Sequence, residues 1–172
     1  MEQRVHPCLI PAGAPLAHVE DVLNAVAVEG DFVGLTMFEG AGAGAFPTAS
    51  AVIADIVDIA RGLRISTFGR PVAELEEVPC VPMENHFGAY YIRLSVADKP
   101  GVIADISAIL RDGDISMESM LQHGHAKTLS GAVTVVITTH EMREATMTSA
   151  LAKIVTLDEV EEPPCMIRME AV

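Results

Sequence analysis

The chain has 172 residues, enough for one or two small domains, and half of them are hydrophobic, so a packed core is expected. Eleven basic against 24 acidic residues give a formal net charge of −13. That balance argues against binding to nucleic acid or to an anionic membrane, both of which need clustered positive charge. The longest run without charge, Gly40–Ala54, is too short to span a bilayer, so we expect no transmembrane helix.

The N-terminus and the cysteines indicate a cytoplasmic protein. The first residues lack the basic stretch and apolar core of a secretory signal. Cys8, Cys80 and Cys165 are far apart, and no pair has the short spacing of a metal or redox motif. We therefore expect three reduced thiols.

Residues 1–70 predict a hairpin and a helix. Apolar runs at Val22–Glu29 and Phe32–Phe38 flank Gly30-Asp31, which is a hairpin signal. An apolar stripe at helical spacing follows over residues 52–63, with Pro47 placed for the first turn. One hairpin and one helix bury little apolar surface. We interpret residues 1–70 as part of an α/β domain whose other parts lie outside this chain.

Residues 71–87 are predicted to be a linker, because this segment is rich in proline and glutamate and lies between two apolar, patterned regions.

Residues 88–172 predict a small α+β domain. Alternating residues indicate strands at 90–96, 115–121, 133–138 and 165–169, and helical stripes begin at Val102 and Glu141. Gly113 is expected to end the first helix, and Gln122–Gly131 is expected to be a loop. The order βαββαβ is ferredoxin-like, with both helices on one face of a four-stranded antiparallel sheet. The other face is predicted to be bare and to hold Tyr91, Arg93, Met120, Val136 and Met166.

The glycine-rich stretch around Gly40, Gly42 and Gly44 precedes the first predicted helix. Glycines allow a ligand to approach the backbone, and the N–H groups of a helix start favour anionic or polar groups. The spacing is not that of the dinucleotide-binding fingerprint, so composition alone favours a tight turn.

Residues 4–62 closely resemble the C-terminal part of the catalytic region of homoserine dehydrogenase. The resemblance rests on Val5-His6-Pro7, on Asn24-Ala25-Val26 with Glu29-Gly30-Asp31, and above all on Gly42–Val52. It implies an NAD(P)-dependent interconversion of homoserine and aspartate semialdehyde, in threonine and methionine biosynthesis. Gly42 and Gly44 would lie at the cofactor. The family's dinucleotide fingerprint and catalytic lysine have no counterpart here, so we expect no catalytic residue and no bound cofactor in this chain alone.

Residues 88–170 resemble an ACT domain, an amino-acid-sensing module. The resemblance rests on Ile92–Ile103, which holds the Asp-Lys-Pro-Gly-Val turn, and on Ile115–Ser119. It implies an amino-acid effector, with threonine as the first candidate, and homo-oligomers formed through ACT domains. The implied effector-binding residues are Asp98, Lys99, Pro100, Gly101, Val102, Ile103 and Ser116.

For two of these residues a structural role is the alternative: Asp98 would cap the helix and Gly101 would ease the turn. Ser116 stands where ligand-binding ACT domains often have Asn, which offers a donor and an acceptor together.

The remaining candidates favour structural roles. His123 and His125 have the spacing of a metal-binding pair, but they fall in a predicted loop without nearby Cys or paired carboxylates. We expect no metal site. His6 has no visible catalytic partner. The sequence therefore predicts a regulatory portion of a homoserine dehydrogenase; the alternative is a stand-alone ACT-type amino-acid-binding regulator with an N-terminal extension.

Overall fold

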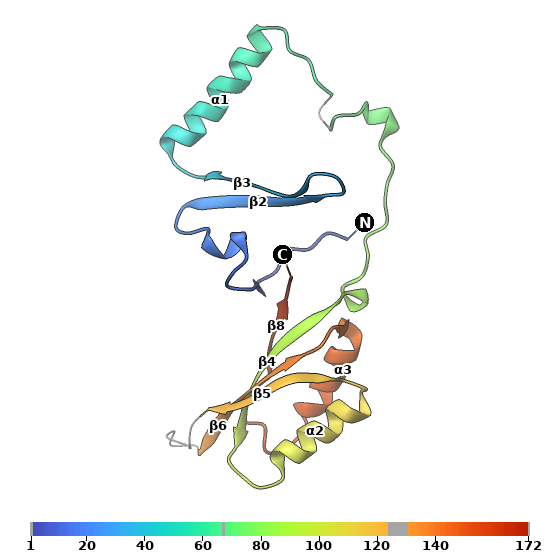
Figure 1. Cartoon of the computed structure of the whole chain (residues 1–172). Helices are drawn as coiled ribbons and strands as arrows, with labels where there is room; N and C mark the ends of the chain where they lie inside the picture. Colours follow the sequence, from blue (N-terminus) through green and yellow to red (C-terminus); the bar gives the residue numbers. More distant parts are fainter. Residues whose placement is uncertain (1, 67, 124–130, 172) are drawn as a thin grey trace. The chain divides into compact units, whose positions relative to one another are not determined.

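A computed structural model of the chain describes residues 2–66, 68–123 and 131–171, and the chain forms two compact units (Figure 1). The larger unit holds the chain up to Leu9 together with Cys80–Ala171, and the smaller unit holds Ile10–Pro79. The predicted boundaries at residues 70 and 88 differ from this division, chiefly because the N-terminal residues lie in the larger unit.

The larger unit is a sheet with two helices on one face. Its strands are β1 (Cys8–Leu9), β4 (Phe87–Ala97), β5 (Met117–His123), β6 (Ala132–Thr139) and β8 (Cys165–Met169), in the spatial order β1-β8-β4-β6-β5. Neighbouring strands are antiparallel except that β1 pairs with β8 in parallel. A two-residue strand β7 (Met142–Arg143) pairs with the start of β4. The helices are α2 (Val102–Asp112) and α3 (Glu144–Ile154), and a 3-10 turn, η3 (Met83–Asn85), precedes β4.

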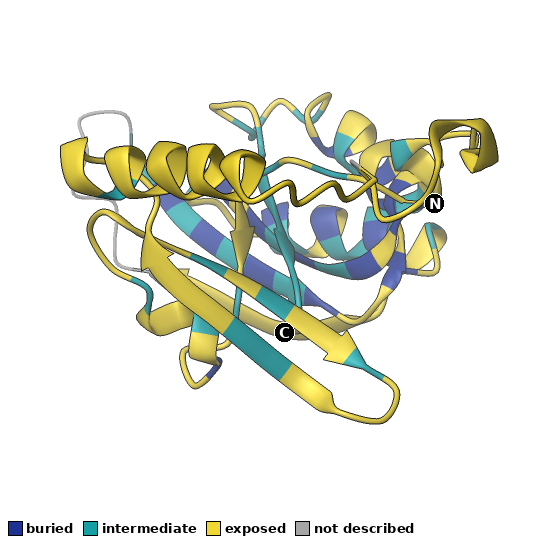
Figure 2. Ribbon diagram, turned by 90° about the horizontal axis from the view of Figure 1, so that it is seen from above, coloured by how far each residue is buried: buried dark blue, intermediate teal, exposed yellow. Residues whose placement is uncertain are grey.

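The order β8-β4-β6-β5 is that of a ferredoxin-like βαββαβ domain, which confirms the predicted α+β fold. The alternating residues of β4 are buried, as the sequence pattern predicts: Tyr90, Ile92, Leu94 and Val96 are each 1% exposed or less (Figure 2). The same face of β6 and one stripe from each helix complete this core. Gly113 ends α2, as predicted.

The open face of the sheet differs from the prediction at two methionines. Met166 pairs with Ile92 and packs against the core, on the helix-covered face. Met120 pairs with Ile137, another residue of that face. A bulge between Met117 and Ser119 adds one residue, and one extra residue reverses the faces of everything that follows in a strand.

The open face therefore holds Leu121 in place of Met120, because Leu121 pairs with Val136. Tyr91, Arg93 and Val136 lie there as predicted. Cys165 and Ile167 lie beside them, since they pair with Arg93 and Tyr91.

The smaller unit contains the predicted hairpin, β2 (Leu23–Gly30) with β3 (Gly34–Ala41), and the predicted helix α1 (Ala45–Ala60). Two 3-10 turns, η1 (Pro15–His18) and η2 (Val72–Glu74), flank them in the sequence. No residue of α1 is buried (Figure 2). Large apolar side chains are exposed along both hairpin and helix, among them Phe32, Phe38 and Ile53. A unit with so little core needs further apolar surface to cover it.

Two further expectations meet the structure only in part. Gln122 and His123 belong to β5, whereas residues 124–130 of the predicted loop lie outside the described residues. Within the part of the chain that the structure describes, no helix is long and apolar enough to cross a membrane.

Candidate functional site

The turn between β4 and α2 holds most of the predicted effector-binding residues. Asp98, Lys99 and Gly101 are exposed, and Gly101 has φ of 102°, a conformation that L side chains rarely adopt. The first helical hydrogen bond runs from the Asp105 N–H to the Gly101 carbonyl, at 3.0 Å. The N–H groups of residues 102–104 precede that bond and point out of the helix start, where they suit an anionic group.

The side chains of this turn divide into two kinds. Val102 is buried in the core and Ile103 packs against it, so these two residues offer only their backbone N–H groups to a ligand. In the described part of the chain no side-chain hydrogen bond caps the start of α2, so the capping role considered for Asp98 is wrong. The turn favours Gly101 because its φ is positive; space is not the reason, since no neighbouring atom lies within 4 Å of a Cβ placed there.

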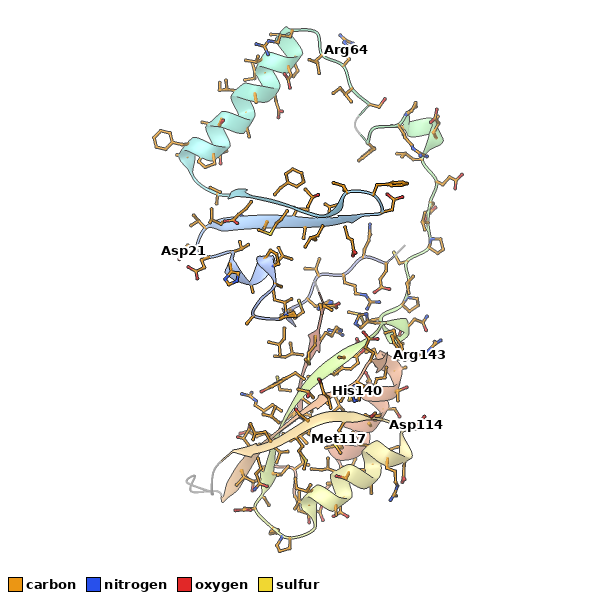
Figure 3. All side chains as sticks on the ribbon, viewed as in Figure 1. Asp21, Arg64, Asp114, Met117, His140 and Arg143 are labelled. Atoms are coloured by element: carbon orange, nitrogen blue, oxygen red, sulfur yellow. The ribbon has the colours of Figure 1, made fainter. Side chains whose placement is uncertain are left out.

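Ser116 lies at the other end of α2, just before β5. Its carbonyl accepts a hydrogen bond from the His140 N–H at 3.0 Å, and its neighbours Asp114 and Met117 mark the same end of the domain (Figure 3). A shallow cavity of about 280 Å³ lies here, and Ser116, Asp114 and Arg111 are among the residues that line it. Because an 11-residue helix is roughly 16 Å long, the turn and Ser116 of one chain do not meet.

Gly42 and Gly44 lie between β3 and α1 and are exposed. Gly42 packs against Asn24: a Cβ placed on it would lie 2.1 Å from the Asn24 Nδ2 atom. Gly44 precedes α1 with φ of 130°, and its carbonyl accepts from the Thr48 N–H at 3.1 Å. Each glycine thus has a structural requirement, and both leave the backbone at the helix start accessible.

The cysteine and histidine candidates stay apart. Cys8, Cys80 and Cys165 are free thiols. Among residues 2–66, 68–123 and 131–171, no three His, Cys, Asp or Glu side chains gather as a metal site would require. His125 and the side chain of His123 lie outside the described residues. The His6 Nδ1 atom lies 3.2 Å from the Pro7 carbonyl oxygen.

A charged cluster in the larger unit was missed by the sequence reasoning. Glu144, in the first turn of α3, holds Arg168 of β8 through two hydrogen bonds, one of them 2.6 Å long from Arg168 Nε. The pair lies beside Tyr90, which is fully buried, and burial raises the Tyr90 pKa to about 12. The hydrogen bonds that Arg168 donates to the Glu144 carboxylate raise the Arg168 pKa. These residues come from three separate segments, so no local pattern signals them.

Comparison with known proteins supports both parts of the sequence interpretation. Residues 1–57 match the homoserine dehydrogenase family, and residues 90–156 match the ACT domain family. A homoserine dehydrogenase of Neisseria gonorrhoeae is 43% identical over 99% of the chain, and one of Helicobacter pylori is 42% identical over 99%. A crystal structure of a homoserine dehydrogenase from Thiobacillus denitrificans superposes on 99% of the chain with a TM-score of 0.85 and 41% identity.

Over almost its whole length the chain matches homoserine dehydrogenases. It spans about 40% of the length of the curated relatives, and 39% of the chain in the crystal structure. It corresponds to the C-terminal part, as predicted, in which a portion of the catalytic region precedes an ACT domain. The larger unit contains the residues that match the ACT domain family. The smaller unit contains most of the residues that match the homoserine dehydrogenase family.

Proposed function

We propose that this chain is the regulatory and assembling part of an NAD(P)-dependent homoserine dehydrogenase. The whole protein would interconvert homoserine and aspartate semialdehyde in the cytoplasm. The ACT domain would sense an amino acid, with threonine as the first candidate. The turn at Gly101 carries this proposal, because it presents unused helix-start N–H groups at an exposed surface.

Both charged groups of an amino acid would find a partner at this turn. The N–H groups of residues 102–104 would donate to its carboxylate, and the Asp98 carboxylate would face its ammonium group. Lys99 and Pro100 shape the exposed part of the turn. A single turn covers little of a small ligand, whereas ligand sites bury most of the surface of what they bind.

A second copy of the chain would complete the site. Ser116 lies at the far end of α2 from the turn, so a site that uses both must take them from two copies. Among the described residues, the strand next to Ser116, β5, forms one edge of the sheet, and the two-residue strand β1 lies at the opposite edge beside β8. Met117, Met120 and Leu121 of β5 are exposed apolar side chains. An exposed apolar edge strand favours pairing with another strand.

The cofactor would meet this chain only at Gly42 and Gly44. Both glycines are exposed and lie next to the start of α1, whose backbone N–H groups could contact a nicotinamide dinucleotide, so the residues present fit contact with it. The cofactor supplies hydride transfer when it is bound. The residues that would hold its phosphates lie in the part of the relatives that this chain does not span. We therefore expect the chain alone to show no turnover of homoserine, and turnover by the pure chain would contradict this expectation.

Calorimetry of the chain against a panel of amino acids, with threonine first, tests the sensing role. Gly101→Asp would place a carboxylate where the ligand's carboxylate is expected, and binding should be lost. Lys153→Ala, at the exposed end of α3, is the control and should bind as the parent does. If Gly101→Asp binds threonine as tightly as the parent, the effector site lies elsewhere. If the folded parent binds no amino acid, the sensing role fails.

The alternative is a stand-alone ACT-type regulator. It is disfavoured by the match of residues 1–57 to homoserine dehydrogenase, which an unrelated extension would not show.

A further inference from the structure

The segment Glu2–Leu9 is attached to the ACT-containing unit through a buried histidine. His86 lies at the end of η3, and its carbonyl accepts a hydrogen bond from the Glu144 N–H at 2.8 Å. Its side chain is 7% exposed, and its ring meets the Tyr90 ring edge-on at a centroid distance of 6.3 Å. The ring also lies over Gly88, since a Cβ there would be 2.8 Å from His86 Nε2. The ring is therefore fixed in place by the fold.

Carboxylates face both nitrogens of this ring. Glu2 Oε1 is 3.4 Å from His86 Nδ1, which is within hydrogen-bond distance. Glu170 Oε1 is 3.8 Å from His86 Nε2, which is an ion-pair distance only, and within the described residues Nε2 has no hydrogen-bond partner. A neutral imidazole has a hydrogen on one nitrogen only, so one carboxylate would then face a lone pair. An imidazolium presents a hydrogen to both. A protonated ring would therefore complement Glu2 and Glu170 together.

The charges around the ring point the same way. Arg168 is held by Glu144, and Arg4 is held by Glu2 and also contacts the Met83 sulfur. Three carboxylates thus surround two guanidinium groups, and a protonated His86 makes the cluster neutral. Within the described residues, His86 is the one cationic partner of Glu170 within 4 Å.

The other titratable groups near the ring do not supply that charge. Tyr90 stays protonated, because burial raises its pKa to about 12. Glu84 on η3 and Arg143 on β7 are exposed. The hydrogen bond from Arg4 lowers the Glu2 pKa, so the Glu2 charge persists below the ordinary range of a carboxyl group.

We propose that protonated His86 is a pH-dependent clamp that holds the segment Glu2–Leu9 on the ACT-containing unit. The clamp joins a segment of the homoserine dehydrogenase match, residues 1–57, to a unit that holds the ACT match. The segment is also attached by the Arg4–Met83 contact and by the pairing of β1 with β8, where the Glu170 N–H donates to the Leu9 carbonyl at 2.9 Å. Glu170 therefore serves both the clamp and the strand pairing. This inference goes beyond the proposed function and does not depend on effector binding.

The sign of the pH dependence follows from the charges. Attachment favours the protonated ring, so it is strongest where His86 is protonated and both glutamates are charged, and it weakens as the pH rises. Histidine is the side chain whose charge changes between about pH 5 and 8. A transition coupled to one proton changes its equilibrium by up to about tenfold per pH unit.

Trypsin cleavage after Arg4 measures the detachment. The Arg4 side chain is 10% exposed and held by Glu2, so it must leave the cluster before a protease can bind it. Arg64 is exposed in the smaller unit and is a reference in the same molecule (Figure 3). The ratio of cleavage at Arg4–Val5 to cleavage at Arg64–Ile65 cancels the pH dependence of the protease. In the 172-residue chain this ratio should rise several-fold between pH 6 and 8.

Two variants decide the outcome. His86→Gln should remove the pH dependence of the ratio, and His140→Gln, which changes an exposed histidine, should retain it. If His86→Gln does not fold, Glu170→Gln should shift the rise to lower pH, because it removes one of the two facing carboxylates. A flat ratio in the parent chain, an unchanged slope in folded His86→Gln, or an unchanged curve in Glu170→Gln would each overturn the proposal.

Discussion

Removing the charge of Glu144 should destabilise the larger unit more than any exposed substitution. Glu144 and Arg168 have side chains 9% and 16% exposed, and they share two hydrogen bonds. Glu144→Gln leaves the Arg168 guanidinium buried beside Tyr90 without its counter-charge. Breaking a buried pair in this way costs about 3–5 kcal/mol, against a total domain stability of about 5–15 kcal/mol.

Urea unfolding followed by tyrosine fluorescence measures this loss in the larger unit alone. The chain has no Trp and two Tyr, and both tyrosines lie in β4. That selectivity matters, because a chain with two units need not unfold in one step. With a urea slope of about 1–3 kcal/mol per molar, a loss of about 3–5 kcal/mol lowers the midpoint by roughly 1–5 M.

Two comparisons separate the buried pair from a general effect of charge. Asp112→Asn removes one side of the Arg111–Asp112 pair, whose side chains are 75% and 62% exposed, and it should cost less than about 1 kcal/mol. Replacing both buried partners, Glu144→Leu with Arg168→Met, should recover most of the loss, because no unpaired charge remains. A cost below about 1 kcal/mol for Glu144→Gln would refute the reasoning, since the pair would then behave like an exposed one.

Three further results are expected. Leu121→Lys should reduce self-association in light-scattering measurements, because Leu121 is 52% exposed on the edge strand β5. The control Val155→Lys, at the end of α3, should leave self-association unchanged. Equal effects of the two variants would argue against pairing through β5. Tyr90 should titrate at a pKa of about 12 by ultraviolet absorbance. Because the folded pKa is raised, stability should fall as the pH rises from about 10 through 12; titration of Tyr90 near 10 would contradict the burial of its hydroxyl. Gly42→Ala should lower the stability of the hairpin, as measured by hydrogen exchange, because the added Cβ would lie 2.1 Å from the Asn24 Nδ2 atom. Gly40→Ala is the control and should have a smaller effect, because no atom lies within 4 Å of a Cβ placed there.

Local pattern determined the elements of this protein. Alternation in β4 and β6, the stripes of α2 and α3, and the hairpin around Gly30 and Asp31 all follow from the spacing of apolar residues. Each element was found, although α3 begins at Glu144 and not at Glu141 as predicted, because Met142–Arg143 form the strand β7. Gly113 also ends α2 as predicted. These features depend on residues within one turn or one strand of each other, so the sequence contains all the information that they need.

Short motifs in the sequence were enough to predict the two families that the chain resembles. The Gly42–Val52 stretch and the Asp98–Val102 turn were sufficient for both assignments, and the comparisons confirm them. The effector-binding roles of Asp98–Ile103 and Ser116, and the cofactor-binding roles of Gly42 and Gly44, remain predictions.

Only the tertiary structure decided which residues meet across long separations. The bulge at Glu118 exchanges the faces of Met120 and Leu121, and a strand pattern read from one end cannot reveal an added residue. The two residues of β1 are too few to show any period, yet they cover the β8 edge and, among the described residues, leave β5 at the opposite edge. His86 shows no local sign of its role, because the carboxylates that face it come from opposite ends of the chain, Glu2 and Glu170. Sheet edges and buried charges depend on where the folded chain returns, and the local free energies that shape a single helix or strand do not specify that return.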